Sequence, residues 1–252
     1  MSRKAFTLIE LLVVIAIITV LIAVLVPTSV RVRNQARGVV CLQNLRTLSL
    51  SWLTYKDDNG DNLVGGHVGK HTYDWVQGPT GEASPVECEK EGIRRGSLFI
   101  YAGNNVNAYR CPADKRKLTL DQAAFRSYSI AGGANGEVWQ NSYLQVKKYS
   151  EITGPAGKYI FVEESDPRGW NMGSWVMNPK TKAWVDPLAV WHGGAGSTLG
   201  FADGHALVRT WVDDSTIEMS QNQEFFHPIP ADEGEDLIFM AGGFPCRTPE
   251  NP

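Results

Sequence analysis

The residues with the clearest potential for chemistry are two histidines and an aspartate in the last quarter of the chain. His192, Asp203 and His205 lie in the segment WHGGAGSTLGFADGH (191–205), and such side chains could form a catalytic or metal-binding trio. However, an aspartate in a turn usually caps its own backbone. The sequence also contains no nucleophile elbow, phosphate-binding loop or HExxH motif to accompany them. We therefore interpret this element as a structural hairpin held by His192, and we expect no enzymatic activity.

The segment around this aspartate predicts a hairpin within an antiparallel sheet. Apolar residues on both sides flank Asp203 and Gly204, a pair favoured in two-residue type I′ turns. Two further stretches, SYSIAGG (127–133) and KYIFVEES (158–165), are rich in β-branched and aromatic residues. They predict two more strands.

A calcium site is the next chemistry that the sequence suggests. Asp57, Asn59 and Asp61 alternate within DDNGDN (57–62), as ligands do in a calcium loop. The sixth position is Asn62 instead of Gly, and no glutamate follows at the required distance. We interpret the segment as a solvated turn that ends a helix, and the sequence contains no clear motif for bound calcium or any other cofactor.

Four cysteines could support disulfide or metal chemistry. Cys41, Cys88, Cys111 and Cys246 are compatible with two disulfides in an oxidising compartment. No CxxC pair and no Cys/His cluster with zinc spacing occurs in the sequence. Four cysteines allow three pairings, and the alternative that some are buried thiols stays open.

One carboxylate lies near the start of an apolar segment of membrane-spanning length. Between Phe6 and Pro27, Glu10 is the only ionisable side chain. About 20 helical residues cover the roughly 30 Å hydrocarbon core, and a charge there is costly without a partner. The run is too long for a secretory signal peptide, and its exit has no small-x-small cleavage site. A plain signal anchor would not need Glu10.

The leader MSRKA followed by FTLIE (6–10) resembles the start of bacterial type IV pilins and type II secretion pseudopilins. The resemblance implies that prepilin peptidase cuts between Ala5 and Phe6 and methylates the new Phe6 amine. Glu10 would then pair with the Phe6 ammonium of a neighbouring pilin-like subunit, and the alternative is a contact between Glu10 and Phe6 of the same helix. Ala5 replaces the glycine that the family normally has there. The resemblance also implies a single-pass protein of the bacterial inner membrane with a periplasmic globular domain.

Two internal landmarks resemble the same class. The segment 192–204 is similar to the H-x9-DG signature of many bacterial pilin-like proteins, with ten residues instead of nine between histidine and aspartate. CLQNLR and YRCPAD resemble segments around cysteines that recur in one large pseudopilin-like subfamily. This resemblance implies a Cys41–Cys111 disulfide, which leaves Cys88 to pair with Cys246.

A long N-terminal helix is the first element that the sequence predicts. Its second half carries a stripe of apolar residues every three or four positions, namely Cys41, Leu45, Leu48, Trp52 and Tyr55. We expect one helix from about Phe6 to Tyr55, bent near Pro27. The predicted fold class is α+β, with this helix packed on an antiparallel sheet in a pilin-like lollipop. The predicted parts are a leader (1–5), a transmembrane assembly helix (6–27), an amphipathic helix (28–56) and a β-rich globular domain (57–252).

Composition limits the classes of function. With 252 residues, 43% of them hydrophobic, the chain can form one anchor and one globular domain with a sizeable core. A formal net charge of −3 argues against nucleic acid as a partner. Residues 63–107 are glycine-rich and predict loops with short strands. The acidic tail from Val212 to Cys246 has no Lys or Arg and carries eight acidic residues between Asp213 and Asp236. It predicts a solvated loop, with a cation site as the weaker alternative.

These observations favour a structural subunit of a type II secretion or type IV pilus-type filament, with prepilin peptidase, other pilin-like subunits and the inner membrane as partners. The alternative is an envelope-anchored binding domain that uses the helix only as an anchor. Glycans would be its ligands, because the chain has eight tryptophans. A third and weaker hypothesis is an anchored hydrolase that uses His192 and Asp203.

Overall fold

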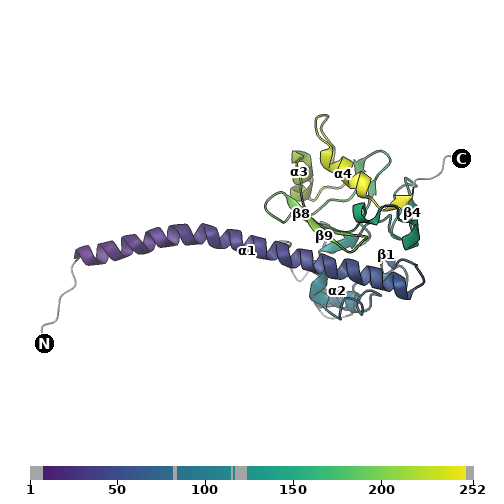
Figure 1. Ribbon diagram of the computed structural model, residues 1–252, viewed down its shortest axis with the longest axis horizontal. Coiled ribbons are helices and arrows are strands. Elements are labelled where there is room, and N and C mark those ends of the chain that lie inside the picture. Colours follow the sequence, from purple (N-terminus) through teal and green to yellow (C-terminus); the bar gives the residue numbers. More distant parts are fainter. Residues whose placement is uncertain (1–7, 82–83, 115, 117–123, 248–252) are drawn as a thin grey trace.

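The computed structural model describes residues 8–81, 84–114, 116 and 124–247. A long helix, α1, projects like a stalk from a globular part that combines short helices and strands (Figure 1). The helices are α1 (Leu8–Asp58), α2 (Pro85–Arg94), α3 (Asp214–Asn222) and α4 (Glu235–Gly243), with 3-10 turns η1 (Val106–Tyr109), η2 (Tyr149–Glu151) and η3 (Pro155–Gly157). The strands are β1 (Gly65–Val68), β2 (Asp74–Val76), β3 (Tyr128–Ile130), β4 (Leu144–Gln145), β5 (Tyr159–Glu163), β6 (Met177–Asn178), β7 (Ala183–Trp184), β8 (Gly196–Phe201), β9 (Ala206–Thr210) and β10 (Cys246–Arg247).

The first half of α1 and its second half have different surroundings. The helix continues through Pro27, and Figure 1 shows it curving over its first half. All side chains described between Leu8 and Val26 are exposed. By length and composition this half could cross a membrane. In the second half, Cys41, Leu45, Leu48 and Trp52 are fully buried, as the apolar stripe predicts.

The main sheet is antiparallel, with strand order β3-β5-β8-β9. The second half of α1 packs across β8, β9 and β5. The α+β fold class, a long N-terminal helix on an antiparallel sheet, is therefore confirmed. All three strand regions expected from composition form strands of this one sheet.

Two hydrophobic clusters lie on either side of the sheet, and β5 contributes to both. Ile160 and Phe161 belong to the cluster that contains the α1 stripe, whereas Tyr159 and Val162 belong to the cluster beneath α3 and α4. An irregularity in the β5–β8 register between Tyr159 and Phe161 accounts for the break in simple alternation. β5 is therefore buried on both faces and can hold polar groups away from water.

The turn between β8 and β9 differs from the predicted type I′ turn. Of the two central residues of that prediction, only Gly204 has a positive φ, of 94°. The Phe201 amide donates to the His205 carbonyl at 2.9 Å, and the Gly204 amide donates to the Phe201 carbonyl at 3.0 Å. These bonds define a three-residue loop, in which a type I turn is followed by a left-handed glycine.

The acidic tail is not the solvated loop that its composition predicts, because it forms α3 and α4. Asp213 and Asp236 are buried, and each caps the segment of the other. Asp236 Oδ2 accepts hydrogen bonds from the Val212 and Asp213 amides, both at 2.9 Å. Asp213 Oδ2 accepts from the amides of Gly234 at 3.1 Å and Asp236 at 2.8 Å. The prediction failed because the caps come from distant segments.

The glycine-rich region 63–107 contains the expected short strands β1 and β2, and also a helix that was not predicted, α2. Pro85 begins this helix, in the position where a proline costs no hydrogen bond. Lys90 pairs with Glu87 at 2.6 Å and Arg94 with Glu91 at 3.3 Å, both one turn apart. The glycines of the neighbouring loops masked this helical spacing.

Candidate functional site

Four potential ligand groups meet where α1 joins the sheet. Cys41 of α1 and Cys111, which follows η1, form a disulfide with Cα atoms 5.1 Å apart. His192 Nε2 lies 3.4 Å from Cys111 Sγ and 2.9 Å from Glu163 Oε1. One donor atom from each of the four side chains lies within 4.8 Å of all the others, and all four residues are buried. We call these four residues the Cys-Cys-His-Glu cluster.

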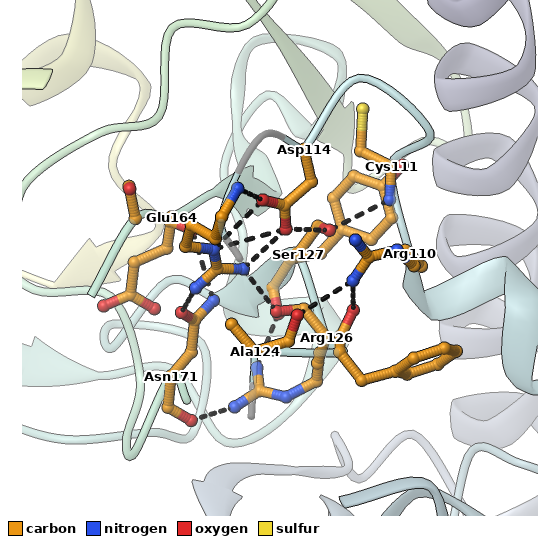
Figure 2. A network of polar contacts seen from close by, with 12 residues as sticks. Arg110, Cys111, Asp114, Ala124, Arg126, Ser127, Glu164 and Asn171 are labelled. Atoms are coloured by element: carbon orange, nitrogen blue, oxygen red, sulfur yellow. Dashed lines mark hydrogen bonds and ion pairs between the residues drawn. The ribbon is translucent and has the colours of Figure 1, made fainter. Parts of the chain in front are cut away.

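A hydrogen-bonded chain fixes Cys111 relative to the sheet. The Cys111 amide donates to Ser127 Oγ at 3.0 Å, and Ser127 Oγ donates to Asp114 Oδ2 at 2.7 Å. Figure 2 shows this chain leading from Cys111 through Ser127 to Asp114. Arg116 adds an ion pair to Asp114 at 2.8 Å. The sequence CPAD therefore positions a cysteine and the carboxylate that locks its loop.

Glu163 and His192 are fixed by strand backbone. Glu163 ends β5, is fully buried, and accepts a hydrogen bond from the Thr198 amide of β8 on Oε2 at 2.8 Å. Its Oε1 is the oxygen that faces His192. The His192 backbone exchanges two hydrogen bonds with Gly196, which starts β8, at 2.9 and 2.7 Å. These contacts direct Nε2 towards the sulfurs, while Nδ1 is buried and has no hydrogen-bond partner among the described residues.

A second buried network lies beside the cluster and carries charge. The Arg126 side chain donates to the carbonyls of Tyr128 and Asn171, and Figure 2 shows its contact with Asn171. Burial lowers the pKa of Arg126 to about 10. Glu89 of α2 accepts from the Arg126 amide at 2.8 Å. Burial raises the pKa of Glu164, the neighbour of Glu163, to about 7.

His192 and Asp203 do not form the pair that a catalytic trio requires. They flank opposite ends of β8, a strand of six residues that spans about 17 Å at roughly 3.3 Å per residue. Asp203 Oδ1 instead accepts from the His205 amide at 3.1 Å and lies 2.5 Å from His205 Nδ1. That pair lies at the surface, and the partner of His192 is Glu163.

The processing and assembly residues lie at the start of the chain. Ala5 and Phe6, the predicted cleavage pair, are outside the described residues. Glu10 lies in the first turn of α1 and is exposed, as are the apolar residues around it. Within the described residues of this single chain, no folded domain lies against this half of the helix.

The predicted Cys88–Cys246 pairing is wrong. Cys88 lies on α2, which packs against β2 and η1, and its thiol donates to the Gly81 carbonyl at 3.4 Å. Cys246 lies on β10, which pairs with β4 and contacts the cluster beneath α4. The two cysteines belong to different parts of the fold. Pairing them by elimination, after Cys41 was assigned to Cys111, is therefore not justified.

The glycan-binding alternative loses its supporting observation. Five of the eight tryptophans are buried and the other three are only partly exposed. Trp52 and Trp75 pack in the cluster that contains the α1 stripe, and Trp175 packs in the other.

The DDNGDN turn (57–62) has a structural role, because Asp61 Oδ2 accepts a hydrogen bond from the Ser150 hydroxyl at 2.6 Å.

Glu163 is the site residue that sequence analysis missed. A signal was present, since KYIFVEES places two glutamates directly after an apolar strand core. A carboxylate that continues such a strand must be paired if the strand is buried on both faces. Nothing in the order of the residues indicated that His192 would be its partner.

Comparison with known proteins finds one family match, at the N-terminal end of the chain. Residues 1–26 match the family described as the prokaryotic N-terminal methylation motif. No curated protein and no solved structure matches the chain. The chain thus carries a prepilin-type N-terminal segment like that of type IV pilins and pseudopilins. The match ends at residue 26, so the likeness of 192–204 to the H-x9-DG signature stays a prediction.

Proposed function

We propose that this protein is a structural subunit of a type II secretion or type IV pilus-type filament. Prepilin peptidase cuts it between Ala5 and Phe6, and it then assembles through the first half of α1. The observation that carries this proposal is the methylation motif over residues 1–26, which coincides with the half of α1 whose described side chains are all exposed. Before assembly this half lies in the inner membrane, with the globular part on the periplasmic side.

Glu10 is the residue that distinguishes assembly from simple anchoring. In lipid or in a bundle of apolar helices its carboxylate is costly unless it meets a positive charge. After cleavage the Phe6 ammonium of a neighbouring subunit supplies that charge. Pairing between subunits then sets the axial register of the filament. A plain membrane anchor gains nothing from a carboxylate at this position.

The test has two parts in a bacterium with an active prepilin peptidase. Intact-mass measurement of the protein from native membranes should show loss of MSRKA and gain of one methyl group. Glu10→Ala should be inserted and cut normally, yet be largely absent from sheared filaments or pseudopili. Thr19→Ala is the matched control, because the Thr19 hydroxyl donates to Ile15 of its own helix at 2.7 Å.

Two results would contradict the proposal. Retention of Met1 under these conditions excludes processing by the peptidase. Normal incorporation of the Glu10→Ala protein shows that the helix is only an anchor.

A further inference from the structure

The donor atoms of the Cys-Cys-His-Glu cluster are those that zinc uses in proteins. Cys41 and Cys111 offer two sulfurs, His192 offers Nε2 and Glu163 offers Oε1. Zinc takes cysteine, histidine and carboxylate ligands in tetrahedral sites that are closed to water when the metal is structural. Cys41, Cys111 and Glu163 are fully buried and His192 is 6% exposed, which suits a closed site.

The distances need only local adjustment to fit a metal. With zinc bonds of about 2.0–2.3 Å, the ligand atoms of a tetrahedral site lie roughly 3.3–3.8 Å apart. Here the four donor atoms lie within 4.8 Å of one another, with His192 Nε2 already 3.4 Å from Cys111 Sγ. The two sulfurs are bonded and must separate to bind a metal. A disulfide and a metal ion therefore exclude each other at this place.

The disulfide alone does not explain why the Glu163 carboxylate and the His192 imidazole are buried beside it. A disulfide is neutral and packs in an apolar core without a charged neighbour, whereas burying Glu163 and His192 beside it is costly. Both ligands are already oriented from outside the cluster. The Thr198 amide holds Glu163 Oε2 and leaves Oε1 towards the cluster, and the Gly196 backbone fixes the histidine segment. Such outer contacts orient metal ligands.

We propose that Cys41, Cys111, His192 and Glu163 bind one zinc-class divalent ion when the two cysteines are thiols. Metal binding releases the two thiol protons and ties α1 to β5 and β8 before oxidation. A disulfide-bearing oxidoreductase then replaces the metal. Two thiolates give up two electrons and form the Sγ–Sγ bond, the partner's disulfide takes up these electrons and two protons to become two thiols, and the metal ion leaves. This inference does not depend on the proposed filament function.

The test uses the full chain in detergent. The disulfide is opened with a phosphine reductant, and mass spectrometry after alkylation counts the thiols. Cobalt(II) is added first and zinc second. The reduced chain should bind one cobalt ion with intense thiolate-to-cobalt absorption, and zinc should displace it. The oxidised chain should bind neither ion at this site.

Variants separate this site from adventitious binding. Glu163→Gln should weaken zinc binding by about 10-fold or more, and Cys41→Ser with Cys111→Ser should abolish the thiolate absorption. Cys88→Ser with Cys246→Ser should change neither, because these residues lie elsewhere in the fold. Circular dichroism of each reduced protein shows whether it is folded.

Each outcome decides the proposal. A folded reduced chain without stoichiometric metal overturns it, and so does equal binding after replacement of Cys41 and Cys111. If reduction unfolds the globular part, zinc should restore the fold, since metal binding supplies folding free energy. Failure of zinc to restore it would also refute the site.

Discussion

The two halves of α1 differ in the pattern of their apolar residues and in their surroundings: the first half is apolar on all sides, and the second carries an apolar stripe. From Leu8 to Val26 every described side chain is exposed in the single chain, whereas the stripe of the second half, from Cys41 onwards, is buried. The surroundings differ because β5, β8 and β9 pack against α1 along its buried second half, whereas none of the helix window of membrane-spanning character near the N-terminus is buried within the described chain. Apolar content therefore shows that a helix face will be buried, but the rest of the chain decides what buries it.

Charged side chains also differ between the buried region where the second half of α1 meets the sheet and the surface of the globular part. Where the second half of α1 meets the sheet, Glu163, Arg126 and Glu164 are buried and hydrogen-bonded within the globular part. At the surface, His205 and Asp203 form a pair that is about one third exposed or more. Substitutions at these two places compare the loss of a buried hydrogen-bonded pair with the loss of an exposed one.

The largest effect is expected from a charge placed on the buried stripe. Leu45→Asp should lower the free energy of unfolding by about 5 kcal/mol or more, since it removes a core side chain and buries an unpaired carboxylate. Val39→Asp, on the same helix at 66% exposure, should change it by less than about 1 kcal/mol. Denaturant unfolding of the full chain in detergent measures both. Equal losses would mean that the buried and exposed faces of α1 do not differ as described.

His192→Ala should rank second, at about 3–5 kcal/mol. It leaves the Glu163 carboxylate buried with its Oε1 partner removed, and breaking a buried pair costs about this much. His205→Ala is the matched control, because the His205–Asp203 pair is exposed and surface pairs contribute about 1 kcal/mol or less. The same unfolding measurement applies. A loss no larger for His192→Ala than for His205→Ala would contradict the structural role assigned to the Glu163–His192 pair.

The third prediction concerns pH and Glu164. Burial raises its pKa in the folded protein to about 7, above its ordinary value of 4.5, so the folded state binds this proton more tightly than the unfolded state. The free energy of unfolding should therefore fall as pH rises from about 4.5 to 7, by up to about 3 kcal/mol from this group. Glu164→Gln should remove that part of the slope, while Glu91→Gln, a change at an exposed glutamate, should keep it. An unchanged slope in Glu164→Gln would show that Glu164 is ionised when folded.

The sequence predicted the elements whose signals are local. The apolar run, the stripe at Cys41 to Tyr55 and the β-branched segments correspond to α1, β3 and β5 in the structure. Each of these is set by residues within a few positions of one another. The Cys41–Cys111 pairing also agrees with the structure, but it was predicted from a family resemblance.

The sequence did not predict features that depend on contacts between distant residues. Glu163 meets His192 only because β5 and β8 are paired, and Asp213 caps α4 only because α3 and α4 lie together. The acidic tail was misjudged for this reason, since its composition resembles a solvated loop. The Cys88–Cys246 pairing failed similarly, because elimination contains no information about where α2 and β10 lie.

The smallest effect should come from the turn that contacts the second half of α1. Gly204 has a φ of 94°, and a Cβ atom there would lie 3.1 Å from Leu50 Cδ2 and 3.2 Å from Leu53 Cδ1. Gly204→Val should destabilise the protein by roughly 1–3 kcal/mol, because a β-branched residue is strained at this φ and the two leucine side chains must move. Gly204→Asn should cost less, since asparagine adopts left-handed backbone more easily. Thermal melts of the two variants beside the wild type measure the difference. If both substitutions cost the same, steric crowding against Leu50 and Leu53 of α1, and not backbone strain, explains why glycine is required at position 204.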